Sequence, residues 1–131
     1  MNVSDLDLGW LAGLFDGEGC ITRAGGKYGH PELTITNTDS KLIEKAQRVL
    51  DALEIDSSIT TIAAQKVHYK VRYSLRVNSS AGIQRFFTVV PIQSKEKHDR
   101  YEALKSELAN RHRSHTVARR QRLARQYPAL L

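Results

Sequence analysis

Two acidic residues lie close together in a glycine-rich segment near the start of the chain. Asp16 and Glu18 alternate with Gly17 and Gly19 directly after an apolar stretch. Carboxylates and backbone carbonyls are the oxygen ligands that hard divalent cations prefer, and glycines leave room for both to turn toward one ion. The segment could therefore hold a divalent metal. A polar turn after a core helix is the simpler alternative, because short turns rich in Asp and Gly are common.

The residues before the two acids predict a helix that positions them. Ser4 begins a Ser-x-x-acid pattern typical of a helix N-cap, and the helix is expected to run to about Phe15, with Glu18 just past its end. Ala12 and Gly13 are small residues on this otherwise apolar helix. Because a glycine inside a helix costs about 1 kcal/mol relative to alanine, its presence suggests close packing against another backbone. Two copies of the helix, packed face to face, would provide it.

Residues 11–19, Leu-Ala-Gly-Leu-Phe-Asp-Gly-Glu-Gly, resemble the LAGLIDADG motif at nearly every position. The resemblance implies a site-specific homing endonuclease that hydrolyses phosphodiester bonds in double-stranded DNA with a divalent metal. The expected ion is Mg²⁺, for which Mn²⁺ or Ca²⁺ can substitute in binding. In the family, the residue matching Glu18 binds the metal, assisted by the carbonyl of the residue matching Gly17. Asp16 is expected instead to end the helix and orient the turn.

The chain has a single copy of this motif, and the resemblance then implies a homodimer that acts on a long, nearly palindromic site. The motif helices of the two subunits would form the dimer interface. The expected interface residues are Leu11, Ala12, Gly13, Phe15 and Asp16. A dimer would bring two Glu18 carboxylates close together, where they would repel each other unless metal ions lay between them.

A second segment, residues 35–41, resembles another part of the family's active site. Asn37 matches an amide that positions the attacking water, and Lys41 matches a cation near the scissile phosphate. Both positions also suit ordinary structural roles. Asn37 could simply form a turn, and Lys41 could be a solvated residue in the first turn of a helix.

Residues 91–98 resemble the segment that carries the family's active-site lysine, which stabilises developing charge on the phosphate. Aligning on Pro91 places Glu96 at that position. Aligning on the Lys-x-Lys pattern selects Lys95 and requires a one-residue gap. We prefer Lys95, with Lys97 as the alternative.

Around these residues, the hydropathy pattern predicts an α+β domain with the order α-β-β-α-β-β-α, as in LAGLIDADG endonucleases. The four expected strands are Cys20–Arg23, Leu33–Thr36, Ser58–Ala64 and His68–Val77. Helices are expected to begin at a cap formed by Asp39 and Ser40, at Asn78-Ser79-Ser80, and at about Ser94, with the last one running to Arg111. One antiparallel sheet would then have helices on one face and a concave face open to DNA.

The run from His68 to Val77 alternates polar and apolar residues and predicts which side chains meet DNA. Its outward set is His68, Lys70, Arg72, Ser74 and Arg76. Thr34 and Arg23 are further candidates from the first two strands. Arg72 is the expected base reader, because arginine pairs bidentately with guanine. A solvated sheet face is the alternative for this set.

The charge distribution favours a polyanionic partner. The net charge is +6, residues 57–95 contain no Asp or Glu, and residues 111–131 contain six arginines and no acid. The expected organisation is a domain over residues 1–112, followed by a basic tail or helix over residues 113–131. This tail is expected to contact phosphates rather than bases.

Other features of the composition exclude several classes of protein. The chain of 131 residues has one cysteine, Cys20, so no internal disulfide can form, and no Cys/His cluster suggests zinc. No apolar run approaches the length of about 18 residues that a membrane span needs. An acidic start without basic residues does not fit a targeting peptide. We therefore expect an intracellular protein, in a prokaryotic cytoplasm or an organelle, that is neither secreted nor bound to a membrane.

Two other functions remain open at this point. A LAGLIDADG-type regulator could bind DNA without cutting it, and a maturase with the same fold could act in RNA splicing. The acid at Glu18 favours cleavage, but it does not exclude a maturase.

Overall fold

The computed structural model describes residues 3–24 and 29–126, with only the backbone described at residue 24 and at 111–126. In chain order the elements are α1 (Asp5–Glu18), β1 (Gly19–Ala24), β2 (His30–Asn37), α2 (Ser40–Ala52), β3 (Ser58–Ile62), β4 (Arg72–Val77), α3 (Ser80–Val89) and α4 (Lys95–Gln126). The order confirms the predicted α+β class.

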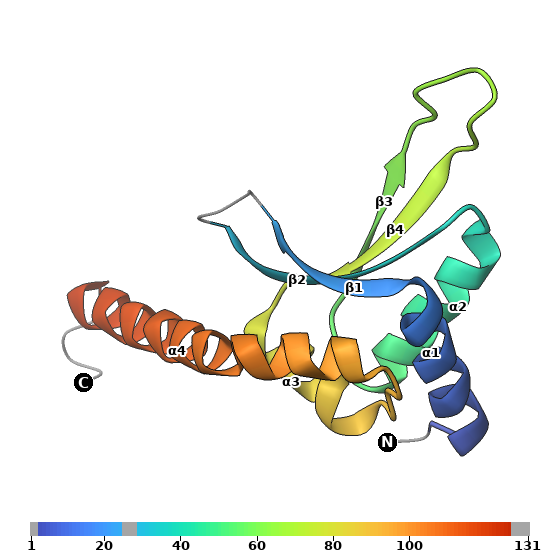
Figure 1. Ribbon diagram of the computed structural model, residues 1–131. Coiled ribbons are helices and arrows are strands. Elements are labelled where there is room, and N and C mark those ends of the chain that lie inside the picture. Colours follow the sequence, from blue (N-terminus) through green and yellow to red (C-terminus); the bar gives the residue numbers. More distant parts are fainter. Residues whose placement is uncertain (1–2, 25–28, 127–131) are drawn as a thin grey trace.

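The strands form one antiparallel sheet in the order β1-β2-β4-β3. The helices lie against one face of this sheet, and the other face is open and curved between the β1–β2 and β3–β4 hairpins (Figure 1). This is the predicted arrangement.

Helix α2 shows how the sequence specifies the layer under the sheet. The Asp39 side chain caps it by accepting the backbone N–H groups of Lys41 and Leu42. Its apolar stripe buries Ala46 and Leu50 completely, while Leu42 lies at the margin of the core. The side chains of β2 and β4 that face the helices alternate with those of the open face, as the two-residue period of a strand requires.

The end of α1 is built around Phe15, whose fully buried ring makes edge contacts with Phe86 and Phe87 at 5.0 and 5.7 Å. A Cβ on Gly19 would lie 2.1 Å from Phe15 Cδ2, so only glycine fits where the chain turns into β1. The prediction that α1 stops near Phe15 is wrong by one turn. The helix continues through Gly17, and Glu18 is its last residue.

The prediction of a strand from His68 to Val77 is also partly wrong. Strand β4 begins at Arg72, where pairing with Ile62 of β3 ends. Between them the chain forms a protruding hairpin loop (Figure 1) that contains His68, Lys70 and a turn closed by the Tyr69 N–H and the Lys66 carbonyl. Without a partner strand, the apolar side of this loop stays exposed, at 53% for Tyr69.

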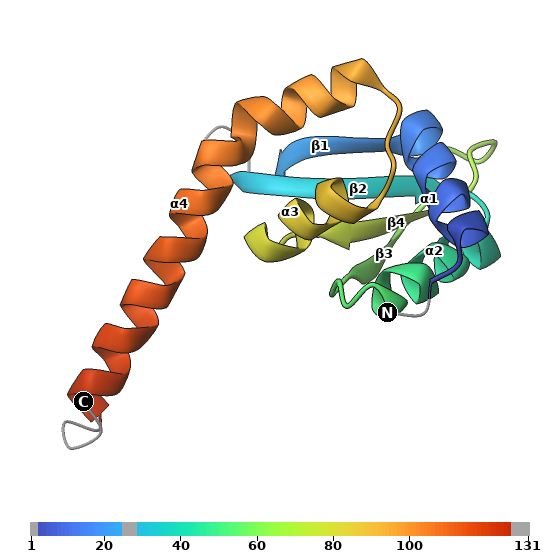
Figure 2. The ribbon, with the colours of Figure 1, turned by 90° about the horizontal axis from the view of Figure 1, so that it is seen from below.

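Helix α4 is longer than predicted. It continues from the domain into the expected basic tail and ends at Gln126, and residues 127–131 lie outside the described part of the chain. Near its start Tyr101 stacks on Phe87, with ring centroids 4.3 Å apart. Beyond the domain the helix projects away from the body (Figure 2). Within the described ranges, none of the helices has the length and apolar character needed to cross a membrane.

Candidate active site

The carboxylate of Asp16 is fixed by the loop that precedes α4. Its two oxygens accept the backbone N–H groups of Gln93 and Ser94, each at 2.9 Å. Ser94 in turn accepts the Lys97 N–H at its hydroxyl, at 3.3 Å, as a helix N-cap does. Asp16 is therefore a structural link between the end of α1 and the start of α4.

Lys97 makes the reciprocal contact. Its ammonium group donates to the carbonyl oxygens of Phe15 and Asp16, at 2.7 and 2.6 Å. Both carbonyls belong to the last turn of α1, where a cation is favourable, and the Phe15 oxygen also accepts the Gly19 N–H. A half-buried positive charge thus lies beside the end of the motif helix.

Glu18 contrasts with Asp16. Its side chain is exposed, and within the described part of the chain its carboxylate takes part in no hydrogen bond or ion pair. Of the two acids in the motif, Glu18 is therefore the one available to an external ligand. Among the described residues, no group of three or more His, Cys, Asp or Glu side chains is placed to hold a metal ion.

Gly19 at the start of β1 pairs with Ile35 of β2. Glu18 directly precedes Gly19, and Asn37 follows Ile35 by two residues, so Asn37 and Glu18 lie at the same end of the sheet. Its side-chain oxygen accepts the Asp39 N–H at 2.9 Å and so forms the turn into α2. Lys41 is exposed in the first turn of α2. The structural role expected as an alternative for Asn37 is present, and Asn37 retains donors for other partners.

Lys95 lies further out than Lys97. Its side chain is 90% exposed, and its ammonium group pairs with Asp99 at 2.8 Å. The hydrogen bond to Asp99, followed by the negative charge of that residue, raises the pKa of Lys95. Of the two lysines considered from the sequence, Lys97 is the one in contact with the motif.

The residues expected at a dimer interface divide into two groups. Leu11, Ala12 and Phe15 are buried in the core of their own subunit, so they have almost no surface to offer to a second one. Asp16 is committed to the loop before α4. Gly13 is exposed, and a Cβ built there meets nothing within 4 Å. Of the expected interface residues, the three buried ones are core residues of their own subunit and Gly13 has an open surface; a dimer interface on α1 stays a prediction.

Gly9 and Gly17 belong to the same open side of α1, and neither of them is among the interface residues expected from the sequence. A Cβ at either position also meets nothing within 4 Å. Together with Gly13 they recur every fourth residue, which places all three along one side of the helix. The four-residue spacing of the glycines is the sequence signal that could have identified this side of the helix.

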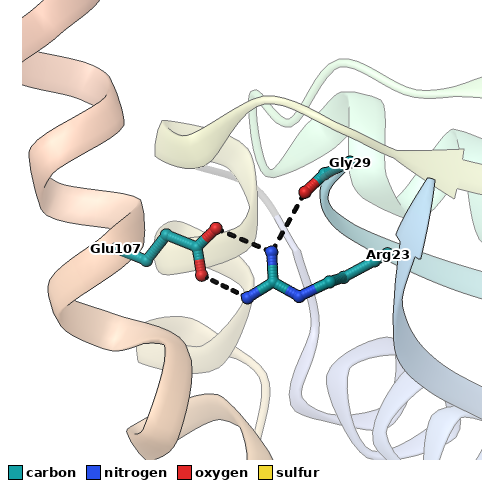
Figure 3. Close-up of polar contacts among 3 residues, drawn as sticks. All are labelled: Arg23, Gly29 and Glu107. Carbon is teal, nitrogen blue, oxygen red and sulfur yellow. Dashed lines mark hydrogen bonds and ion pairs between the residues drawn. The ribbon is translucent and has the colours of Figure 1, made fainter. Parts of the chain in front are cut away.

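Arg23 does not lie on the open face, where it was expected. Strand alternation places it on the side of buried Ile21, opposite to Thr22. There its guanidinium contacts both carboxylate oxygens of Glu107 in α4, at 2.8 and 2.6 Å, and the Gly29 carbonyl at 3.0 Å (Figure 3). The hydrogen bond to Glu107 raises the pKa of Arg23. Arg23 therefore anchors α4.

The open face carries Thr34, Arg72 and Arg76, as expected, but it is not free of acid. Glu32 of β2 is 5% exposed and pairs with Arg76 at 2.8 Å. Ser74 is also on this side, yet it is buried and accepts a hydrogen bond from Thr36 at 3.1 Å. Ser74 thus offers little surface to a ligand, and exposed Arg72 is the less constrained of the two arginines.

Comparisons with known proteins agree with this geometry. The family model of the LAGLIDADG-like domain matches residues 5–91, about two thirds of the chain. A crystal structure of the LAGLIDADG meganuclease I-AabMI, bound to uncleaved DNA, is similar with a TM-score of 0.56 and 19% identity. The match covers 80% of this chain and 38% of that one, so the chain spans well under half of the meganuclease's length. No curated protein matches.

The motif helix, the sheet it leads into and the open curved face define a domain of the LAGLIDADG endonuclease fold. Because the family model matches residues 5–91, which include the motif, the chain belongs to the LAGLIDADG homing endonuclease family.

Proposed function

We propose that the protein is a metal-dependent, site-specific DNA endonuclease that works as a homodimer. The observation that carries the proposal is the contrast between the two acids of the motif. The Asp16 carboxylate accepts two backbone hydrogen bonds, whereas the exposed Glu18 carboxylate at the end of α1 has no hydrogen-bond or ion-pair partner among the described residues. Glu18 is therefore the acid that is available to bind metal.

The oxygen donors at this end of α1 fit a hard cation such as Mg²⁺, with Mn²⁺ or Ca²⁺ able to replace it in binding. Glu18 would hold the ion with its carboxylate, and Gly17 with its carbonyl. The described part of one chain provides no cluster of three metal-binding side chains, so the other ligands would come from the second subunit and from DNA phosphates. When bound, the ion polarises the phosphate and lowers the pKa of a bound water.

Side chains of the same subunit would complete the site. Lys97 is the cation that we assign to the active site, because its ammonium group contacts the carbonyl oxygens of Phe15 and Asp16, three and two residues before Glu18. It would stabilise negative charge on the phosphate. Asn37 and Lys41 would orient water and phosphate from the other side. Lys95, which we preferred from the sequence alone, is less well placed because it pairs with Asp99.

The dimer would form through the open side of α1. Gly9, Gly13 and Gly17 each leave space where a second helix could approach closely, and Leu6 on this helix is 82% exposed. A helix that carries three glycines at a cost of about 1 kcal/mol each needs a compensating contact.

Double-stranded DNA would lie against the open face of the sheet. Arg72, Arg76 and Thr34 would contact it from the strands, and His68 and Lys70 from the β3–β4 loop. Arginine side chains can read guanine in the major groove, and lysines can contact phosphates. Two such faces in a dimer would read the two halves of a long, nearly palindromic site.

The test is to incubate the purified protein with DNA that carries the uninterrupted insertion locus of its own gene. We expect double-strand cleavage with Mg²⁺ and none with EDTA. Binding of this DNA without cleavage would contradict the nuclease and indicate the DNA-binding regulator. Failure to bind it, with selective binding of the transcript, would instead indicate the maturase.

A further inference from the structure

The C-terminal half of α4 extends beyond the domain as a separate arm. Leu108 is the last fully buried residue in the described side chains of α4, and the helix continues to Gln126. Residues 109–126 would extend for about 27 Å at 1.5 Å per residue. The family model ends at residue 91, before α4 begins. The arm therefore lies outside the region that matches the family (Figure 2).

Two arginine contacts fix the direction of α4 where the arm begins. Arg23 pairs with Glu107 through two short hydrogen bonds, one residue before Leu108 (Figure 3). About two turns earlier, Arg100 donates to the Ile21 carbonyl at 3.2 Å, on the edge strand β1. The arm is thus held against the edge strand at its base.

The arm has the composition of a surface for a polyanion. Residues 111–126 contain no Asp or Glu, and their six arginines are Arg111, Arg113, Arg119, Arg120, Arg122 and Arg125. Like charges at helical spacing repel one another, so this helix is destabilised in the absence of a partner. The favourable interaction of cations with a helix C-terminus reaches only the last turn and does not explain Arg111 or Arg113.

The order of these residues along the helix favours an extended partner. Arg111, His115, Arg119 and Arg122 follow one another at spacings of four, four and three, so they recur along one side of the helix. Such a row suits a line of phosphates, and guanidinium groups bind phosphate bidentately. The open face of the same chain also carries Arg72 and Arg76, so the chain presents arginines in two separate places.

We propose that residues 111–126 form a second DNA-binding surface, which binds the phosphate backbone of duplex DNA outside the segment covered by the sheet. The proposal rests on the proposed function in taking DNA as the partner, but it does not depend on cleavage. It predicts binding that is independent of sequence and strongly dependent on salt.

The experiment measures binding of a 30-base-pair duplex of arbitrary sequence by fluorescence anisotropy, in EDTA and over a range of KCl concentrations. The test variant is Arg119→Gln/Arg122→Gln in the full chain. The control variant is Arg48→Gln/Lys105→Gln, which removes the same charge from exposed positions on α2 and on α4 before the arm. Circular dichroism checks folding, and Arg119→Lys/Arg122→Lys restores the charge.

Each phosphate contact contributes about 0.9 to the slope of log K against log salt concentration. We therefore expect the slope to fall by about 0.9 to 1.8 in the arm variant, to stay at the wild-type value in the control, and to recover in the lysine variant. The proposal would be overturned if the arm variant and the control variant had the same slope of log K against log salt concentration. It would also be overturned if the wild-type protein showed no salt-dependent binding. A preference for an RNA duplex of the same sequence would overturn it as well. A failure of cleavage with an intact slope difference would count against the nuclease alone.

Discussion

The ammonium group of Lys97 lies 2.6 Å from the carbonyl oxygen of Asp16, at the last turn of the motif helix. The Asp16 carboxylate in turn accepts the Ser94 N–H at the start of α4. The two helix ends therefore hold each other, and Glu18 projects from this junction with no partner among the described residues. The motif acid that links the two helices and the motif acid that stays available to a ligand are therefore different residues.

Replacing Lys97 by methionine is expected to lower the free energy of unfolding by about 1–3 kcal/mol. The change leaves two carbonyls at the helix end without a charged donor, and hydrogen bonds to charged groups contribute about that amount. Urea denaturation of Lys97→Met measures it. Lys95→Met is the matched control, because that ammonium group is exposed and, among the described residues, pairs with Asp99 alone. Equal losses in the two variants would contradict the contact of Lys97 with α1.

Asp16→Ala is expected to destabilise the fold by about 1–3 kcal/mol, since two backbone N–H groups lose their acceptor. Glu18→Ala should change stability by no more than about 0.5 kcal/mol, as is usual for a surface substitution. Thermal and urea denaturation of both variants, without divalent ions, compare the two acids directly. A larger loss of stability for Glu18→Ala than for Asp16→Ala would show that Glu18, and not Asp16, is the acid that stabilises the fold.

Gly13→Arg tests the dimer. A side chain at this position meets nothing within 4 Å in the subunit, so the variant should fold. An arginine would nevertheless prevent close approach of a second α1 helix. We expect a dimeric wild-type protein and a monomeric variant by analytical ultracentrifugation, with Ala81→Arg, exposed on α3, remaining dimeric. A dimeric Gly13→Arg variant would place the interface elsewhere.

Tyr101 should make stability sensitive to alkaline pH. Burial first, and then the charge of Glu102, raise the pKa of its phenol above the ordinary value of 10.0. Its contribution is fully present below pH 10, where the phenol is protonated in both folded and unfolded chains. It is lost as the pH rises from about 10 through the higher pKa of the folded state. Unfolding free energies of the wild-type protein and Tyr101→Phe, compared from pH 8 to 11, should show a smaller alkaline loss in the variant; parallel curves would contradict the burial of the phenol.

The sequence was sufficient for the elements whose pattern is local. Ser4, Asp39 and Ser79 begin helices as expected, and the motif places its acids at the end of α1. The two-residue period of a strand also predicts the correct face of the sheet for Arg23, because Arg23 must share a face with apolar Ile21.

Other features depend on partners that are distant in sequence. The alternation from His68 onward has the form of a strand, but β3 ends at Ile62 and leaves those residues unpaired. Glu32 reaches Arg76 only through the pairing of β2 with β4, and Lys97 reaches Asp16 only through the packing of α4. No local pattern contains these contacts, which is why the sequence alone could not place Lys97, rather than Lys95, against the end of the motif helix.

The measurement that tests the central claim most directly compares cleavage and binding by Glu18→Gln and Glu96→Gln. Both changes remove one exposed carboxylate, from α1 and from α4 respectively. On DNA that carries the uninterrupted insertion locus, with Mg²⁺, we expect the cleavage rate of Glu18→Gln to fall at least about 100-fold. Glu96→Gln should cut at the wild-type rate, and both variants should still bind the DNA in Ca²⁺. Cleavage by Glu18→Gln at the wild-type rate would contradict the role of Glu18 as the metal ligand.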